Sequence, residues 1–354
     1  MAWIKPQFSK GAVNRSGVIL ASQLDSEDLS TALDVINNWR AAHNFPLNTF
    51  QIRLRDKAKQ IDPQCLIAQR IKRLSSIRSK LMRIDGLKLA QIQDIGGCRA
   101  IVKDINSVDK LVDIYKHRAS RGLKHVLFAE DDYIFEKPKE SGYRSAHLVY
   151  QYKSDKNEIY NNLKIEVQIR SILQHTWATS VETVDTFTGQ SLKSGIGDLE
   201  WKRFFALISS VIANKEHRPP IPNTPENFNE LRSEIAHLQS RLNVISKLQA
   251  YRATLEYTGD TYYTKGAYFL LSLNPSVKKI DIRSFRRTDS TKAYLAYQEL
   301  EKNSIGTRAD VVLVSADSIE SLKLAYPNYY ADTARFINLL REILTGNSQL
   351  TLFD

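Results

Sequence analysis

A proline-rich break near residue 220 constrains the fold of this chain more than any other feature of its sequence. The segment HRPPIPNTPENFNE (217–230) holds four prolines. Proline fixes φ and removes a hydrogen-bond donor, so helices and central strands end at such a cluster. The chain has 354 residues, a length that suits two domains. We therefore expect one domain at residues 1–218 and a second at residues 225–354.

Segments on both sides of the break mix helical and strand patterns, which predicts the fold class α+β. The first domain reads as a mixed β-sheet flanked by helices, and the second as a small α+β unit that opens with one long helix over residues 230–256. The pattern also predicts a helix over 25–60 that is interrupted at Pro46. Predicted strands include CRAIV, HLVYQY and LKIEVQIR before the break, and AYFLLSLN, KKIDIRSF and ADVVLVSA after it. Two shorter segments are CLIAQRIK (65–72), which fits a strand or a helix, and a helix that begins near Ser75 or Ser76.

The positive charge of the chain lies in the first domain. Residues 1–218 hold 34 Lys and Arg against 24 Asp and Glu, whereas residues 219–354 hold 16 against 15. Between Arg53 and Arg83 there are ten basic residues and two acidic ones. Such a stretch attracts the phosphates of nucleotides or RNA, although a charge run alone more often forms a solvated surface.

The remaining composition excludes several classes of protein. Two cysteines, Cys65 and Cys98, rule out a disulfide scaffold and a four-cysteine zinc site. No apolar run reaches the length of a membrane helix, and MAWIKPQFSKGAVNRSG at the start of the chain lacks the apolar core of an export signal. We therefore expect a cytoplasmic protein with no membrane partner.

Three separated segments carry residues suited to phosphate chemistry. Asp94 stands beside two glycines at the mouth of a predicted buried strand, where one carboxylate can bind Mg²⁺ together with phosphate oxygens. In KIEVQIR, period-two spacing places Glu166, Gln168 and Arg170 on one face of a strand. The turn EKPKESGYRSAH (136–147) crowds cations and an aromatic ring around a glycine.

Each of these segments also has an ordinary structural explanation. Asp94 could cap a turn, the polar residues of KIEVQIR could form the wet face of a half-exposed strand, and Gly142 could sit in a plain turn. Taken together they are harder to explain in this way. Phosphoryl transfer needs cations that bind phosphate, a metal ligand, and a carboxylate that orients or deprotonates the attacking hydroxyl.

The order of these segments resembles a known family. The series RIK…SIRSKL, DIGGCRAIV, YIFEKPKESGYRSAH and EVQIRSILQHTWA is similar, over about residues 60–180, to the synthetase domain of the RelA/SpoT-type synthetase family. The resemblance implies a nucleotidyltransferase-like synthetase domain. It also implies transfer of pyrophosphate from ATP, with Mg²⁺, to a ribose hydroxyl. The family's hydrolase domain has a His-Asp metal motif that this sequence lacks, so we do not expect the chain to break down the product.

The resemblance assigns a role to each matching position. Asp94 and Glu166 would be the catalytic and metal-binding carboxylates, with Glu166 also the base for the acceptor hydroxyl. The ATP-binding residues would be two arginines that enclose the adenine and two lysines on the phosphates: Arg70, Arg99, Lys72 and Lys80. Tyr143 would stack on the acceptor base. The other acceptor-binding residues would be Lys139, Arg144, His147, Gln168, Arg170 and His175, with Trp177 in the pocket wall.

The second domain resembles the antitoxin region of the fused toxin–antitoxin proteins called CapRel, which sense phage capsid protein. The similarity lies in SIESLKLAYPNYYADTARFI (318–337), where Tyr326 and Tyr329 match a YxxY motif. It implies a pseudo-zinc-finger-like domain that inhibits the synthetase by placing a tyrosine where adenine would bind. The alternative is that both tyrosines pack in the core of the small domain.

These resemblances predict a self-inhibited toxin of anti-phage defence. Its reaction would be ATP-dependent pyrophosphate transfer to the 3′ CCA end of tRNA, which inhibits translation. A phage structural protein such as the major capsid protein would be the trigger, and we expect a monomer. Two alternatives remain open: a small alarmone synthetase that makes guanosine tetra- or pentaphosphate from GDP or GTP, and a catalytically dead RNA-binding regulatory module.

Overall fold

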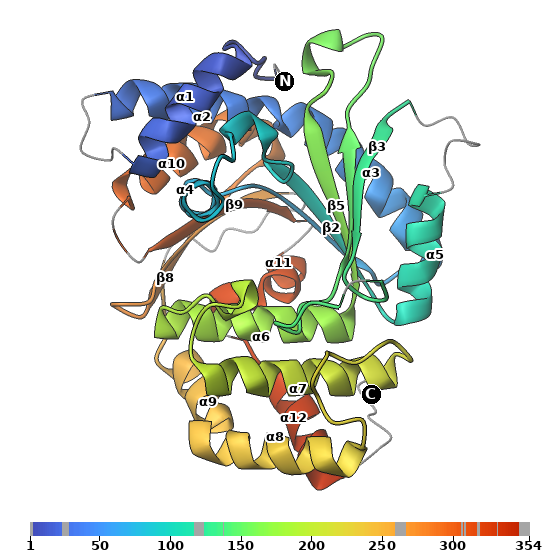
Figure 1. Cartoon of the computed structure of the whole chain (residues 1–354). Coiled ribbons are helices and arrows are strands. Elements are labelled where there is room, and N and C mark those ends of the chain that lie inside the picture. The colour runs from blue at the N-terminus through green and yellow to red at the C-terminus, as the bar shows by residue number, and fades with distance from the viewer. Residues whose placement is uncertain are drawn as a thin grey trace.

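A nine-stranded mixed sheet forms the centre of the computed structural model (Figure 1). The structure describes residues 3–22, 28–116, 124–136, 138–258, 267–305, 307, 309–316, 319–330 and 332–346. Within these residues the strand order is β3-β4-β5-β2-β1-β9-β7-β8-β6. The strands are β1 (Leu66–Ile71), β2 (Gly96–Val102), β3 (Val126–Asp132), β4 (Ala146–Gln151), β5 (Lys164–Ser171), β6 (Glu256–Thr258), β7 (Ala267–Asn274), β8 (Lys279–Phe285) and β9 (Asp310–Ala316).

Helices lie on both sides of this sheet, and some of them pack on other helices. The α-helices of the described residues are α1 (Lys10–Ser22), α2 (Leu29–Ala42), α3 (Asn44–Ile61), α4 (Leu74–Arg83), α5 (Ile105–Lys116), α6 (Ile172–Thr188), α7 (Leu199–Lys215), α8 (Phe228–Leu242), α9 (Val244–Ala253), α10 (Ser290–Asn303), α11 (Ile319–Ala325) and α12 (Ala334–Thr345). Because helices pack beside a sheet with both parallel and antiparallel strand pairs, the α+β fold class and the mixed sheet are confirmed. None of the described helices is both long and apolar enough to cross a membrane.

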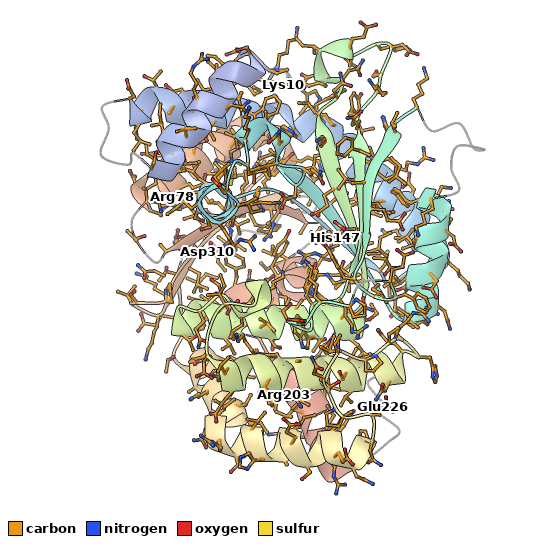
Figure 2. All side chains as sticks on the ribbon, in the orientation of Figure 1. Lys10, Arg78, His147, Arg203, Glu226 and Asp310 are labelled. Carbon is orange, nitrogen blue, oxygen red and sulfur yellow. The ribbon has the colours of Figure 1, made fainter. Side chains whose placement is uncertain are left out.

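The first half of the sheet has one apolar and one polar face, as the alternation in KIEVQIR predicts. β5 runs parallel to β2 and antiparallel to β4, and β1 runs antiparallel to β2. Ile165, Val167 and Ile169 are buried in the core that α3 and α5 cover. The residues between them face the other side of the sheet, where α6 and α11 lie. Figure 2 shows the layer of side chains that fills the space between the sheet and α6.

Strands from beyond the proline break continue the same sheet. β9 pairs with β1 at Gln69↔Ser315 and Arg70↔Val314, and β7 and β8 follow in order. The predicted small α+β unit thus adds its strands to the sheet of the first domain. The domain limits 1–218 and 225–354 stay a prediction, as does the pseudo-zinc-finger-like character of the second unit.

A second core lies among the helices on the polar side of the sheet. Helices α6, α7, α8 and α12 pack on one another there, as Figure 1 shows below the sheet. Their buried residues include Trp177, Phe205 and Leu340. The proline-rich segment joins α7 to α8 as turns, and its Ile221 is buried. The prolines therefore end α7 without separating the helices on either side in space.

Several local predictions were wrong, each for a physical reason. The helix over 25–60 is divided at His43, and Pro46 lies in the first turn of α3, where its missing N–H has no intrahelical acceptor. The long helix over 230–256 is divided at Asn243, whose φ of 51° ends α8 in the left-handed region. Ser75 and Ser76 lie inside α4, and Arg73 precedes it. For CLIAQRIK (65–72), by contrast, the strand alternative is confirmed, because Leu66–Ile71 form β1.

Candidate active site

A small cavity on the polar face brings the predicted acidic residues together. Its volume is about 40 Å³, and it lies between β1, β2, β5 and the C-terminal end of α11. Gly97 in β2 is paired with Glu166 in β5, and Asp94 lies just before β2, so both carboxylates reach this space. The lining residues are Ala68, Arg70, Lys72, Asp94, Gly97, Cys98, Arg99, Glu166, Gln168 and Tyr326.

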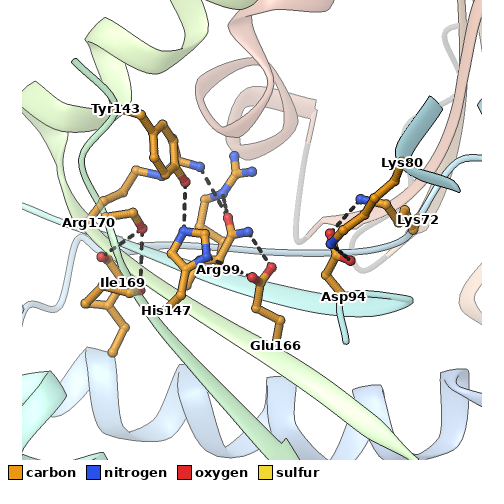
Figure 3. A network of polar contacts seen from close by, with 12 residues as sticks. Lys72, Lys80, Asp94, Arg99, Tyr143, His147, Glu166, Ile169 and Arg170 are labelled. Carbon is orange, nitrogen blue, oxygen red and sulfur yellow. Dashed lines mark hydrogen bonds and ion pairs between the residues drawn. The ribbon is translucent and has the colours of Figure 1, made fainter. Parts of the chain in front are cut away.

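Asp94 is held by two lysines that the family resemblance assigns to ATP phosphates. Its carboxylate oxygens lie 2.5 Å from Lys72 Nζ and 3.0 Å from Lys80 Nζ (Figure 3). Burial alone would raise the pKa of Asp94, but the two ammonium groups keep it well below its ordinary value. Asp94 is therefore an ionised carboxylate with cations beside it, which suits a site for a metal-bound phosphate chain.

Glu166 belongs to a hydrogen-bonded series that ends at Tyr143. Its carboxylate lies 2.8 Å from His147 Nδ1 and 2.6 Å from Gln168 Nε2, and the other ring nitrogen of His147 lies 2.9 Å from the Tyr143 hydroxyl (Figure 3). Burial would raise the pKa of Glu166, but His147 lowers it overall. Burial would lower the pKa of His147, but Tyr143 and Glu166 raise it overall. These hydrogen bonds hold the ionised carboxylate of Glu166 in one orientation, as a general base or a metal ligand requires.

Tyr143 is buried beside two lysines. Its ring centroid lies 5.4 Å from Lys139 Nζ and 5.0 Å from Lys193 Nζ. Lys193 also pairs with Glu182 of α6 at 2.5 Å. The sequence did not identify Lys193 and Glu182, because no local pattern connects a residue of α6 with a residue eleven positions later in a short 3-10 helix (Leu192–Ser194). Lys137, in the same predicted turn, lies outside the described residues.

Arginines surround Glu182 and Gln168 on the same face. Arg99 Nε donates to Gln168 Oε1 at 3.2 Å, and Arg170 Nη2 lies 3.5 Å from the same oxygen. Within the described part of the chain, Nε and Nη1 of the fully buried Arg170 have no hydrogen-bond partner. Burial would raise the pKa of Glu182, but Lys193, Arg99 and Arg70 lower it overall. This excess of buried cations suits an anionic ligand.

Three predicted pocket residues are hydrogen-bonded to other parts of the fold. Arg144 is buried and donates to Ser209 Oγ at 3.1 Å and to the carbonyls of Ile134 and Pro219 at 2.9 and 2.5 Å. Its guanidinium therefore ties the turn to α7 and the proline segment and does not reach the cavity, which differs from the expected acceptor contact. The other two are His175, whose Nε2 lies 3.0 Å from the Leu324 carbonyl, and Trp177, whose Nε1 donates to the Phe205 carbonyl at 2.8 Å.

Gly142 is needed for close packing as well as for the turn. Its φ is 87°, in the left-handed region that favours glycine. A Cβ at this position would lie 2.8 Å from a ring carbon of Trp177. The turn that carries Tyr143 is thus packed closely against α6 and α7.

The carboxylates fit Mg²⁺ by their chemistry. No group of three or more His, Cys, Asp or Glu side chains is placed to hold a metal in the described ranges. Mg²⁺ commonly takes one or two carboxylates and completes its shell with phosphate oxygens and water, and Asp94 and Glu166 line one cavity. Bound there, the ion would neutralise charge on the phosphates while Lys72 and Lys80 turned toward the same phosphates.

The two C-terminal tyrosines lie at and next to the cavity. Tyr326 lines it together with Arg70 and Arg99, and the tyrosine is only 3% exposed. The Tyr329 hydroxyl lies 3.2 Å from Arg73 Nη1 and 3.0 Å from Asp310 Oδ2. Both rings also belong to the apolar cluster of α11 and β9. The cavity beside Tyr326 is far smaller than the several hundred Å³ of a nucleotide site.

The chain is similar to known proteins over its first part. Residues 69–185 match the family described as "Region found in RelA / SpoT proteins". GTP pyrophosphokinase YwaC of Bacillus subtilis (strain 168) is 27% identical over 165 residues, which are 43% of this chain and 76% of that protein. GTP pyrophosphokinase YjbM of the same organism is 31% identical over 115 residues, which are 32% of this chain and 52% of that protein.

Solved structures include similar chains as well. The small alarmone synthetase 1 from Bacillus subtilis bound to its product pppGpp is 24% identical, with a TM-score of 0.34 and coverage of 43% of this chain and 73% of that one. The family match ends before the proline-rich break. Residues 69–185 are therefore similar to the RelA/SpoT region, and the chain is an enzyme of the pyrophosphokinase class.

Proposed function

We propose that this chain transfers pyrophosphate from ATP to the 3′ CCA end of tRNA and thereby inhibits translation. In this proposal the protein is a monomer, inhibited by its own C-terminal part until a phage structural protein such as the major capsid protein releases it. One observation carries the proposal: Tyr326, from beyond the proline break, lines the same cavity as Asp94 and Glu166. A segment of the C-terminal part therefore reaches the face where the chemistry is expected.

The reaction divides between the two carboxylates. Glu166 takes the proton from the attacking ribose hydroxyl, and His147 and Gln168 hold its oxygens in place for this. The hydroxyl oxygen then bonds to the β-phosphorus of ATP, the bond from that phosphorus to the oxygen of the α-phosphate breaks, and AMP leaves. Asp94 would hold the metal, which would neutralise phosphate charge, and Lys72 and Lys80 move from Asp94 to the phosphates of ATP. Arg70 and Arg99 enclose the adenine in the space that Tyr326 lines.

The acceptor side suits a stacked base at the end of a polyanion. Tyr143 supplies an aromatic face, and Lys139 and Lys193 lie near it to meet phosphates. The excess of positive charge in residues 1–218 would attract the backbone of tRNA. Stacking and backbone charge are the usual means of binding single-stranded RNA ends.

Alarmone synthesis is the second candidate, because both curated relatives are named GTP pyrophosphokinases. The cations near Tyr143 would serve the 5′-diphosphate of GDP as well as they serve RNA. A catalytically dead RNA-binding module is a weaker candidate. Asp94 and Glu166 share one cavity with cationic side chains, an arrangement that binding alone does not require.

A transfer assay with labelled ATP tests the proposal, with tRNA and GDP offered side by side. The full chain should transfer little label, and Tyr326→Ala should label tRNA at its 3′ end. Tyr330→Ala is the matched control: Tyr330 is as buried as Tyr326 and lies in the 3-10 helix (Pro327–Tyr330) that follows it, but its ring stacks on Tyr257 and does not line the cavity. Label on GDP alone would favour alarmone synthesis, and no transfer to either acceptor would leave a binding module.

A further inference from the structure

The loop that follows β1 is held in place at both of its ends. It carries Lys72, which binds Asp94, and it leads into α4 at Leu74. The Lys72 N–H donates to the Ile95 carbonyl at 2.8 Å, and the Lys72 carbonyl accepts from Arg40 Nε at 3.0 Å. The Leu74 N–H donates to Glu301 Oε1 at 2.6 Å. The last of these contacts comes from α10, in the C-terminal part of the chain.

Arg40 and Glu301 form one buried ion pair behind this loop. Arg40 Nη1 lies 2.7 Å from Glu301 Oε2, and Arg40 Nη2 lies 3.2 Å from Oε1. The Tyr297 hydroxyl accepts from Arg40 Nη2 at 2.6 Å and donates to Glu301 Oε1 at 2.9 Å. Arg40 is fully buried and Glu301 is 7% exposed. Removing one partner of such a pair leaves a buried charge without compensation, which strongly destabilises a fold.

We propose that Glu301 is a positioning residue for the loop that carries Lys72, acting through Arg40 and the Leu74 amide. This inference rests on the proposed function, in which Lys72 binds the phosphates of ATP. The C-terminal part then has two opposite roles. Tyr326 fills the adenine side of the cavity, whereas Glu301 keeps the phosphate-binding loop in its working position. None of the hydrogen bonds described for Glu301 involves Tyr326 or Tyr329.

Release of the enzyme would therefore move α11 and the tyrosines that follow it while α10 stays in place. The short helix α11 and α10 are separate elements on either side of β9, and none of the side-chain hydrogen bonds described for Glu301 reaches α11. Deleting all residues beyond 218 would remove Glu301 along with Tyr326 and leave Arg40 buried without its carboxylate. A chain truncated in this way is thus not equivalent to the released enzyme.

Kinetics in the full-length Tyr326→Ala protein test the role of Glu301. Adding Glu301→Ala should raise the KM for ATP about tenfold or more and leave the KM for the acceptor unchanged. Glu301→Gln, which keeps an oxygen for the Leu74 amide, should recover part of the loss. Glu234→Ala is the matched control: Glu234 of α8 pairs with Arg203 Nε at 2.7 Å, far from the loop in sequence, and its loss should leave both KM values unchanged.

The opposite kinetic results would overturn the inference. If Glu301→Ala raised activity, or changed both KM values alike, Glu301 would act only in inhibition or in folding. If Glu301→Ala does not fold, hydrogen exchange of the Leu74 amide still decides, because it needs only the Tyr326→Ala and wild-type proteins. The amide should stay equally protected in both, and exchange that is about tenfold faster in Tyr326→Ala would show that α10 leaves with the tyrosines.

These results separate the inference from the proposed function. If Tyr326→Ala gained no transfer activity, the proposed inhibition would be wrong. Equal protection of the Leu74 amide in both proteins would still support a fixed Glu301 contact. If Tyr326→Ala transferred label and Glu301→Ala left its KM for ATP unchanged, the proposed inhibition would stand and the positioning role would be wrong.

Discussion

The ATP side and the acceptor side of the candidate site differ in the part of the chain that they contact. On the ATP side, the residues in and after β1 contact the C-terminal part: Tyr326 lines the cavity with Arg70, and Arg73 pairs with Asp310. On the acceptor side, the described side-chain hydrogen bonds of His147 and Glu166 stay within residues 143–168. The self-inhibition that we propose would therefore act on ATP binding and leave the acceptor side formed.

The order of strands explains this difference. β1 borders β9, so the ATP side adjoins the strands that follow the proline break. β4 and β5 lie on the far side of β2, next to β3. A C-terminal segment that reaches the sheet at β9 meets the ATP side first. Substitutions on each side should therefore have separable effects, of which the largest is expected at Glu166.

Loss of the Glu166 charge should stop the chemistry and leave ATP binding intact. In the Tyr326→Ala protein, Glu166→Gln should lower the transfer rate about a thousandfold, because a general base contributes on that order. The labelled-ATP assay measures the rate, and calorimetry measures ATP binding. Glu182→Gln offers a comparison on the ATP side, since Glu182 lies among Arg70, Arg99 and Lys193 and should change ATP binding more than the rate.

Loss of the Tyr143 ring should weaken the acceptor alone. Stacking of one base is worth about 1–3 kcal/mol, so Tyr143→Ala in the same background should raise the KM for the acceptor about tenfold to a hundredfold. The Kd for ATP should stay within about twofold of the parent, because Tyr143 lies outside the cavity that Tyr326 lines. A parallel loss of ATP affinity would place Tyr143 on the ATP side and remove the distinction.

Low pH should weaken the contact between α6 and α11 beside the ATP side of the site. His175 makes this contact, because its ring joins α6 to the Leu324 carbonyl of α11. Burial, together with the nearby Arg170 and Arg99, holds the pKa of His175 well below its ordinary value, although the Leu324 carbonyl and Glu182 act in the opposite direction. The folded chain keeps the ring neutral, whereas the unfolded chain binds a proton below about pH 6.5. The stability that His175 contributes is thus complete above that pH and falls as the pH decreases.

The variant His175→Gln can still donate to the carbonyl but does not titrate. Between pH 7 and pH 5 the wild type should lose about 1–2 kcal/mol more unfolding free energy than this variant. Urea unfolding of both proteins at the two pH values measures the difference. Parallel losses in the two proteins would mean that His175 does not sense pH in this way.

Sequence periodicity predicted the sheet better than it predicted the site. The alternation of Glu166, Gln168 and Arg170 is a local property of a strand with one polar face, and the structure confirms it. The position of Asp94 beside Glu166 depends on the parallel pairing of β2 with β5, which no local pattern encodes. Only the resemblance to a known family, carried by four ordered segments, assigns these residues to one site from the sequence alone.

Other features were beyond reach because a residue type does not reveal its partners. Arg144 stands among cations in the sequence, but its guanidinium is used by backbone carbonyls and a serine. The proline-rich segment predicts a boundary and marks a turn, but pairing of β1 with β9 joins the chain across it. The sequence around Glu301 does not distinguish it from any other polar residue of a helix, and only the fold brings it to Arg40.

ATP binding to the full chain tests the central claim most directly. A non-hydrolysable ATP analogue should be titrated, in the presence of Mg²⁺, into the wild type, Tyr326→Ala and Tyr330→Ala, with calorimetry as the readout. The Kd of Tyr326→Ala should be at least about tenfold lower than that of the wild type, because the analogue no longer competes with the tyrosine beside Arg70 and Arg99. Tyr330→Ala should bind as the wild type does. Equal affinity in all three proteins would contradict the account.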